Sequence, residues 1–245
     1  MKDKIIQRLH EMRLPAMAAE FELLHERSDY SELSTDEIME KLVECEYYSR
    51  KYNTVSRNIK QARFSDSSAR LENIDYDPSR KINAKLIEQL STNEYIENHR
   101  NVMILGATGC GKSYIGNALG NNACQSGYKV LFARMTDLLE TLSTARIEGN
   151  IRKALKKYVN IDLLIIDDFL LSDTTSLEQK DLMEIFEYRS RGKSTIICSQ
   201  CSPSEWHEKL GGGYIADAIL DRITNNCYKI VLQGDSQRAQ RSTVD

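Results

Sequence analysis

A glycine-rich segment with the sequence GATGCGKS, residues 106–113, restricts most strongly what this chain can fold into. It follows the apolar run NVMIL and precedes the helical pattern SYIGNALGNNACQ. A strand, a glycine loop and a helix in this order are typical of a loop whose backbone N–H groups surround a phosphate, and the helix N-terminus adds partial positive charge. A plain turn would need neither Lys112 nor the hydroxyl of Ser113. The sequence therefore predicts a nucleotide-binding site.

The positions of this loop predict which groups contact ATP and Mg²⁺. Lys112 is expected to reach the β- and γ-phosphates and so to take part in catalysis, and the Ser113 hydroxyl is expected to ligate Mg²⁺. The other positions expected to bind the nucleotide are Gly106, Ala107, Thr108, Gly109, Cys110, Gly111 and Tyr114.

Five short apolar runs alternate with helical patterns in the second part of the chain: NVMILG, KVLFARM, DLLIIDD, STIICS and YKIVLQ. Nearly continuous apolar strands separated by helices are typical of a parallel sheet that is covered on both faces. The predicted fold class of residues 71–245 is therefore α/β, with the glycine loop at the carboxyl edge of the sheet.

Residues 1–70 are predicted to form a small all-helical domain. Short helices are expected near residues 5–12 and 16–25. Ser34 and Glu37 form a capping-box pattern at the start of a longer helix, whose apolar positions recur at spacings of three and four: Ile38, Leu42, Cys45, Tyr48, Tyr52, Val55, Ile59 and Ala62. The polar stretch SDSSARLENIDYDPSR, which ends in Asp77-Pro78, indicates the domain boundary.

Two aspartates follow the apolar run LLII, at the edge where ligands of such sheets bind. Asp167 is expected to hold Mg²⁺ through water, and Asp168 to polarise the attacking water. Taken alone, the pair would also suit a helix cap. The glycine loop favours the catalytic interpretation.

Two further residues are candidates for catalysis. Gln200 follows the next apolar run and would lie between the two motifs, although a plain turn residue explains it almost as well. Arg222 lies in the helical pattern ADAILDRI, where an exposed arginine could reach the nucleotide of a neighbouring subunit. A surface salt bridge with a nearby acid explains Arg222 equally well.

The charge distribution separates one basic stretch from a chain whose net charge is −3. Residues 47–65 contain no acid and carry four aromatic residues, which suggests contact with DNA phosphates; a solvated helix face is the alternative. The bases in this stretch are Arg50, Lys51, Arg57, Lys60 and Arg63. No apolar run approaches 18 residues, so no membrane partner is expected, and a cytoplasmic location is the default expectation.

With these motifs in hand, the chain resembles the IstB-like transposition helper ATPases, relatives of the DnaC helicase loaders in the AAA+ class. The resemblance runs through MRLPAMAAEFELL, the basic helix, GATGCGKS, LLIIDDF, SEWHEKLG, IADAILDRI and GDSQR. It implies an AAA+ ATPase that forms homo-oligomeric rings or spirals on double-stranded DNA with ATP and helps a transposase to engage its target. It also favours a trans role for Arg222.

The resemblance carries two more expectations about the end of the chain. The family lacks a helical lid after the ATPase core, and only about a dozen residues follow YKIVLQ here. Arg238 is then the nearest substitute for a second sensor. A DnaC-like loader of a replicative helicase is the alternative function, and a monomeric P-loop kinase of small molecules is a third, for which no acceptor-binding insertion is apparent.

Overall fold

A computed structural model describes residues 2–27 and 29–234, which form two compact units divided between Arg57 and Asn58. The division falls earlier than the expected boundary at residue 70. The reason is that Asn58 donates hydrogen bonds to the carbonyls of Gly127 and Tyr128, at 3.1 and 3.2 Å, and that Ala62 is fully buried in the core of the second unit.

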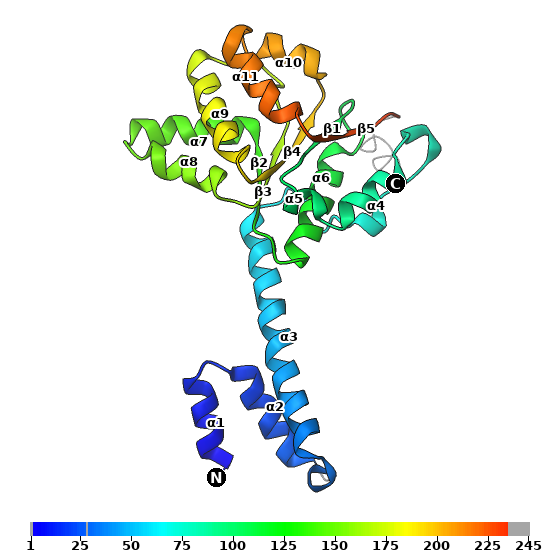
Figure 1. Cartoon of the computed structure of the whole chain (residues 1–245), viewed down its shortest axis with the longest axis vertical. Coiled ribbons are helices and arrows are strands. Elements are labelled where there is room, and N and C mark those ends of the chain that lie inside the picture. The colour runs from blue at the N-terminus through cyan, green and yellow to red at the C-terminus, as the bar shows by residue number, and fades with distance from the viewer. Residues whose placement is uncertain (1, 28, 235–245) are drawn as a thin grey trace, which may run out of the picture. The chain divides into compact units, whose positions relative to one another are not determined.

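The first unit contains α1 (Lys2–Glu11), α2 (Pro15–Glu26), the short helix η1 (Tyr30–Glu32) and the first part of α3 (Thr35–Ala62) (Figure 1). Its small core is formed by Phe21, Leu24 and Leu42. The predicted capping box at α3 is confirmed, because Glu37 accepts from the backbone N–H and the hydroxyl of Ser34, at 2.8 and 2.7 Å.

A buried carboxylate ties α2 to α3 within this unit. Glu46 Oε2 accepts the backbone N–H groups of Ala16 and Met17 at 3.0 and 3.1 Å, which are free donors in the first turn of α2. Its other oxygen accepts Arg50 Nε at 2.8 Å. Burial raises the pKa of Glu46, but these hydrogen bonds outweigh it and lower the pKa overall.

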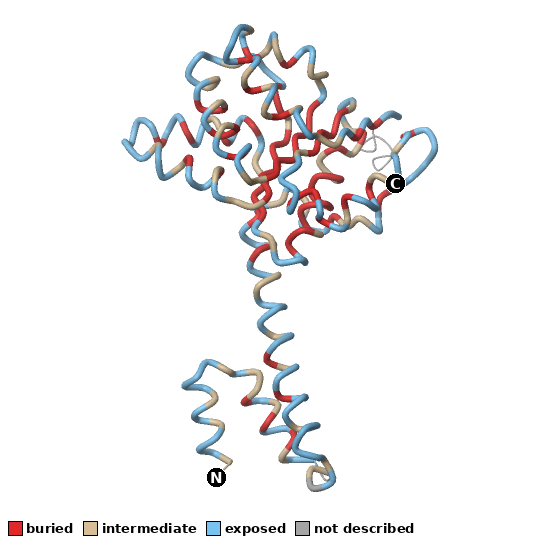
Figure 2. The backbone as a smooth tube through the Cα atoms, viewed as in Figure 1, coloured by how far each residue is buried: buried red, intermediate tan, exposed pale blue. Residues whose placement is uncertain are grey.

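The apolar stripe predicted along α3 is correct at its ends and wrong in its middle. Leu42 and Ala62 are buried, whereas Tyr48 and Tyr52 are 59% and 71% exposed. Figure 2 shows the same change along the helix. Leu42 packs in the core of the first unit and Ala62 in that of the second, and neither core includes Tyr48 or Tyr52.

The second unit is built on a parallel sheet in which all five predicted strands are confirmed. These are β1 (Asn101–Leu105), β2 (Val130–Arg134), β3 (Leu163–Asp167), β4 (Ser194–Ser199) and β5 (Cys227–Val231). Their order is β2-β3-β4-β1-β5, and every pair is parallel, with Val102 opposite Ile196 and Val130 opposite Leu163. The α/β fold class is therefore confirmed.

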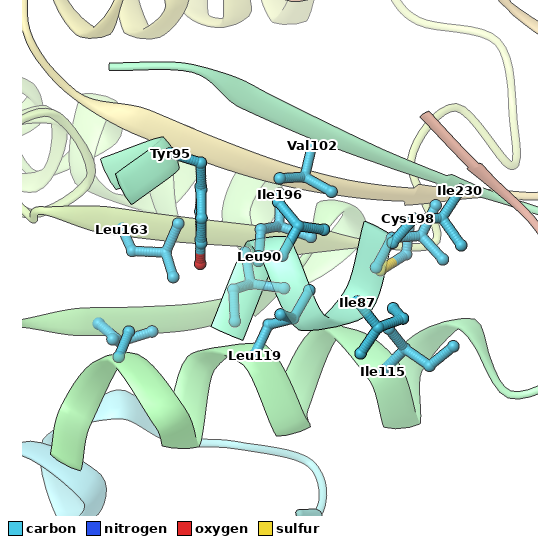
Figure 3. Close-up of a cluster of buried hydrophobic side chains, with 14 of the residues drawn as sticks. Ile87, Leu90, Tyr95, Val102, Ile115, Leu119, Leu163, Ile196, Cys198 and Ile230 are labelled. Atoms are coloured by element: carbon cyan, nitrogen blue, oxygen red, sulfur yellow. The ribbon is translucent and has the colours of Figure 1, made fainter. Parts of the chain in front are cut away.

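Successive strand residues point to opposite faces, so each face has its own buried cluster. One face is covered by η2 (Leu71–Asn73), α4 (Ala84–Ser91), α5 (Glu94–Glu97) and α6 (Lys112–Gln125); η3 (Pro78–Arg80) lies in the chain between η2 and α4. The other is covered by α7 (Met135–Ile147), α8 (Ile151–Val159), α9 (Ser176–Arg189), α10 (Pro203–Lys209) and α11 (Gly213–Thr224). In Figure 3, Ile115 and Leu119 of α6 lie among the side chains of the first cluster.

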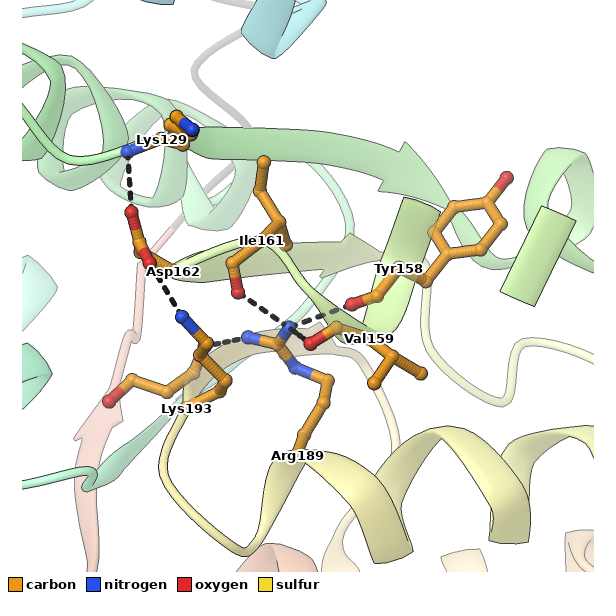
Figure 4. Close-up of polar contacts among 8 residues, drawn as sticks. Lys129, Tyr158, Val159, Ile161, Asp162, Arg189 and Lys193 are labelled. Atoms are coloured by element: carbon orange, nitrogen blue, oxygen red, sulfur yellow. Dashed lines mark hydrogen bonds and ion pairs between the residues drawn. The ribbon is translucent and has the colours of Figure 1, made fainter. Parts of the chain in front are cut away.

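A polar cluster fixes the amino ends of β3 and β4, opposite the edge expected to bind nucleotide (Figure 4). Arg189 is buried and donates to the carbonyls of Tyr158 and Ile161 at 2.7 and 3.0 Å; burial lowers its pKa to about 9. Asp162 accepts Lys193 Nζ at 2.6 Å and the Lys129 N–H at 3.0 Å. These contacts hold the amino ends of two strands whose carboxyl ends form the expected nucleotide-binding edge.

Two expectations concern the end of the chain. The absence of a lid and the role of Arg238 involve residues 235–245, which lie outside the described residues. No helix within residues 2–27 and 29–234 is both long and apolar enough to cross a lipid bilayer.

Candidate functional site

Most of the residues predicted to contact the nucleotide and Mg²⁺ come together at the carboxyl edge of the sheet, where β1, β3 and β4 end side by side. The connection after β1 runs to α6 on one face, whereas the connection after the neighbouring strand β4 runs to α10 on the other; ligands of open α/β sheets bind at such a reversal. A cavity of about 650 Å³ opens there. Among the residues that line it are Thr108, Gly109, Gly111, Lys112, Ser113, Asp167, Asp168 and Gln200.

The loop between β1 and α6 has no room for larger side chains at its first glycine. A Cβ at Gly106 would lie 2.7 Å from both Cys110 Sγ and the Leu232 carbonyl. The Gly106 N–H donates to the Ser199 carbonyl at 3.2 Å, which joins the loop to the end of β4. The loop is thus held between β4 and the residue that follows β5.

Lys112 begins α6 and lies inside the cavity. It is only 5% exposed, and its Nζ donates to the Ala107 carbonyl at 2.7 Å. No acidic residue occupies the first turn of α6, so the ammonium and the helix N-terminus present positive charge to the same space. This arrangement fits a polyphosphate.

Ser113 and Asp167 fit a magnesium ion. The Ser113 side chain acts on the Asp167 carboxyl and lowers its pKa, against burial. The Oδ1 atom of Asp167 is buried and has no hydrogen-bond partner among the described residues. Burial, together with the charge of Asp168, raises the pKa of Asp167. A hydroxyl and a carboxylate with an unused lone pair are the hard oxygen ligands that Mg²⁺ takes from proteins, its other ligands being water and phosphate.

Asp168 and Gln200 lie in the wall of the same cavity. Asp168 follows β3 with a left-handed backbone, φ 52°, a conformation that an aspartate tolerates better than most residues. Gln200 Oε1 accepts the Thr108 hydroxyl at 2.7 Å, so its amide group is tied to the phosphate loop.

Cys110 and Tyr114, which were also predicted to bind the nucleotide, have side chains engaged within the protein. The Cys110 side chain is buried, so only its backbone is available to a nucleotide. The Tyr114 hydroxyl donates to the Arg70 carbonyl at 3.3 Å, which links α6 to the segment that precedes η2. Tyr114 still lines the cavity.

Arg222 lies outside the cavity and is not the exposed side chain that the sequence predicted. It is 25% exposed and is paired with Glu187 of α9, with Nε 2.6 Å from Oε2. The salt bridge weighed as an alternative explanation is therefore present within one chain. Arg222 is also absent from the residues that line the chain's own cavity.

The five predicted DNA-contacting bases fall into two groups. Arg50 is held by Glu46 and also donates to the Arg13 carbonyl at 2.8 Å, so its role is at least partly internal. The other bases of the stretch are exposed. Among them, the nearby charge of Arg63 adds to burial in lowering the pKa of Lys157 on α8.

Several residues of the site were missed by sequence reasoning. Arg134 ends β2 opposite Asp167 and lines the cavity; its position after an apolar run was the available signal. Ser65, Asp66 and Arg80 also line it. They come from the segment before η2 and from η3, and no motif marks them.

Solved structures share this fold. A DNA replication initiation factor aligns with a TM-score of 0.58 at 23% identity, over 73% of this chain and 54% of that one. The DnaC helicase loader aligns with a TM-score of 0.57 at 21% identity, over 67% and 97% of the two chains.

Proteins related in sequence have higher identity to this chain than those solved structures do. An insertion sequence ATP-binding protein of Sinorhizobium fredii is 34% identical over 233 residues, which is 95% of each chain. The ATP-binding protein of insertion sequence IS5376 from Geobacillus stearothermophilus is 28% identical over 246 residues, 100% of this chain and 97% of the relative. The family model of the IstB-like ATP binding protein matches residues 7–244. With its phosphate loop, buried aspartate and parallel sheet, this chain belongs to the IstB-like ATP-binding protein family.

Proposed function

We propose that the chain is an ATP-hydrolysing helper of a transposase, which binds double-stranded DNA and assembles into homo-oligomers when ATP is bound. The observation that carries the proposal is the meeting of Lys112, Ser113 and Asp167 in one cavity, where a buried carboxylate oxygen has no partner in the described part of the chain. A phosphate cradle with a magnesium ligand suits a nucleoside triphosphate better than any other ligand class.

Hydrolysis would use residues already near one another. Ser113 and Asp167 would hold Mg²⁺, which would supply positive charge against the charge that develops on the phosphates. Lys112 would exchange the Ala107 carbonyl for phosphate oxygens. Asp168 would accept a hydrogen bond from the attacking water, and Gln200 would orient it through the side-chain amide that Thr108 positions.

DNA binding is supported by a basic surface in the second unit. Lys60 and Arg63 near the end of α3 are exposed. The charge of Arg63 contributes to lowering the pKa of Lys157, so α8 lies close enough to share this positive charge. Within nine residues α8 carries four exposed bases and no acid: Arg152, Lys153, Lys156 and Lys157. Such a surface suits duplex phosphates, which attract lysine and arginine without regard to sequence.

The transposase is favoured as the protein partner because the relatives that match over nearly the whole chain are proteins of insertion sequences. The structural match to the DnaC helicase loader favours a replicative helicase as the alternative. Tagged full-length chain, incubated with ATP and duplex DNA, should retain the transposase of its own element and not the helicase. Retention of the helicase alone would reverse the assignment.

One assay tests the activity itself. The rate of ATP hydrolysis per chain should require Mg²⁺, rise with protein concentration and increase further with duplex DNA. The reason is that assembly of neighbouring subunits completes each site. Turnover that is unaffected by dilution and by DNA would instead indicate a monomeric phosphotransferase.

A further inference from the structure

Arg80 is a buried arginine that lies against the phosphate loop but belongs to none of the motifs. It ends η3, where the next residue, Lys81, has a left-handed backbone with φ 51°. The Arg80 carbonyl accepts the Gln233 N–H, just after β5, at 3.1 Å. The arginine is therefore held in place by its own backbone, and only 7% of it is exposed.

The Arg80 guanidinium joins two backbone carbonyls. One η nitrogen donates to the Asp75 carbonyl at 2.6 Å, and the other donates to the Cys110 carbonyl in the phosphate loop at 3.0 Å. The Asp75 carboxylate lies 3.7 Å away and is mostly exposed. The Nε atom is buried without a hydrogen-bond partner among the described residues.

The bond to Cys110 determines where the next amide points. In a trans peptide the C=O and the following N–H lie on opposite sides of the chain, so holding the Cys110 carbonyl also holds the Gly111 N–H. A Cβ at Gly111 would lie 2.7 Å from the Arg80 Nη2 atom. The guanidinium therefore packs on the loop at its last glycine, immediately before Lys112.

We propose that Arg80 is a positioning residue for the β-phosphate. By holding the Cys110–Gly111 peptide, it aims the Gly111 N–H into the cavity. The proposal rests on the proposed nucleotide site, because it assigns a function to a residue in the wall of that site. Arginine suits the task better than lysine because its planar fork reaches two acceptors at once.

The test compares three nucleotides rather than one. ADP and ATP carry a β-phosphate and AMP does not, so loss of the aimed amide should weaken ADP and ATP by the same factor. For Arg80→Gln we expect that factor to be about 10 to 100, the range for a charge-assisted hydrogen bond. The affinity for AMP should change less than about twofold. Competition against a fluorescent ADP analogue gives all three values.

Two variants accompany Arg80→Gln. Arg80→Lys keeps the charge but reaches one carbonyl, so its ADP affinity should fall between those of the wild type and Arg80→Gln. If circular dichroism shows that Arg80→Gln does not fold, Arg80→Lys serves as the test variant. Arg70→Gln is the matched control, because Arg70 also donates to two carbonyls of this segment, those of Ser67 and Ala69, at 2.9 Å. It does not line the cavity and should bind ADP as the wild type does.

The outcomes separate the two claims. If a folded Arg80→Gln variant binds ADP normally, or if AMP weakens as much as ADP, Arg80 does not position the β-phosphate. If the wild-type chain binds none of the three nucleotides, the proposed nucleotide site fails.

Discussion

Arg222 on α11 is bonded to Glu187 on α9, with Nε 2.6 Å from Oε2, while its Nη1 donates to the Ala218 carbonyl at 2.8 Å. Within one chain this arginine is paired and lies outside the nucleotide cavity. For Arg222 to act on a neighbour's ATP, the bond to Glu187 has to break, or the pair has to reach the interface together.

Removing Arg222 should therefore separate binding from turnover. Arg222→Ala is expected to keep ATP affinity and to lose turnover by about 10³-fold or more, the range for an arginine supplied in trans. Mixing it with Asp168→Ala should restore part of the rate, because each variant supplies what the other lacks at a shared interface. Steady-state ATPase assays over a range of mixing ratios measure this, and a flat response at zero activity would exclude a trans arginine.

Glu187→Gln tests whether the intrachain pair restrains Arg222. The amide keeps the shape of the carboxylate but removes its charge, so Arg222 is released more easily. We expect turnover at low protein concentration to be equal to or higher than that of the wild type. A loss as large as that of Arg222→Ala would show instead that the ion pair itself is needed.

Asp167→Asn should abolish ATP turnover and stabilise the nucleotide-free fold. Burial raises the pKa of Asp167, and its Oδ1 has no hydrogen-bond partner within residues 2–27 and 29–234, so at neutral pH the ionised carboxylate weakens the nucleotide-free fold. Neutralising it is expected to add about 0.5–2 kcal/mol, or a few degrees in melting temperature, and to abolish Mg²⁺-dependent turnover. Thermal melts without nucleotide provide the measurement, and a lower melting temperature for the variant would contradict this account.

Asp162 should contribute stability that depends on pH. Burial raises its pKa, but the hydrogen bonds from Lys193 and from the Lys129 N–H outweigh burial and lower the pKa overall. A lowered carboxyl pKa adds stability above the unfolded value of 3.8, and this stability is lost as the pH falls through the folded value. Asp162→Asn should cost about 1 kcal/mol or less at pH 7, since solvent screens the pair. Its acid-unfolding curve should merge with that of the wild type at low pH; a constant gap at all pH values would exclude this cause.

The basic residues should differ in their effect on DNA binding. Each phosphate contact contributes about −0.9 to the slope of log K against log salt concentration. Lys60→Ala combined with Arg63→Ala should therefore make the slope about 1.8 less negative. Arg50→Ala is the matched control, because Arg50 is held by Glu46 and Arg13. Filter binding in the presence of ATP measures the slopes. Equal slopes for all variants would show that Lys60 and Arg63 do not contact DNA.

The sheet was predictable because its signals are local. Each strand is a short apolar run, and the glycine loop specifies a strand before it and a helix after it. The middle of α3 was less predictable. Tyr48 and Tyr52 fit the helical period, but whether a stripe is covered depends on what packs against it.

Within the site, motif residues were found and the supporting wall was not. Lys112, Ser113 and Asp167 lie at fixed distances along the sequence from glycines or from a strand end. Arg80 reaches the same cavity from η3, so its role depends on the path of the chain between η2 and α4 and not on a spacing. Arg222 shows a further limit, since Glu187 lies 35 positions away in sequence and no pattern joins the two.

Calorimetric titration of the full chain with ATP and Mg²⁺ tests most directly whether the loop after β1 is the nucleotide site. The wild type should bind one ATP per chain, and Lys112→Ala should bind it far more weakly or not at all while keeping its fold by circular dichroism. ATP binding by Lys112→Ala with the wild-type affinity and enthalpy would contradict the assignment.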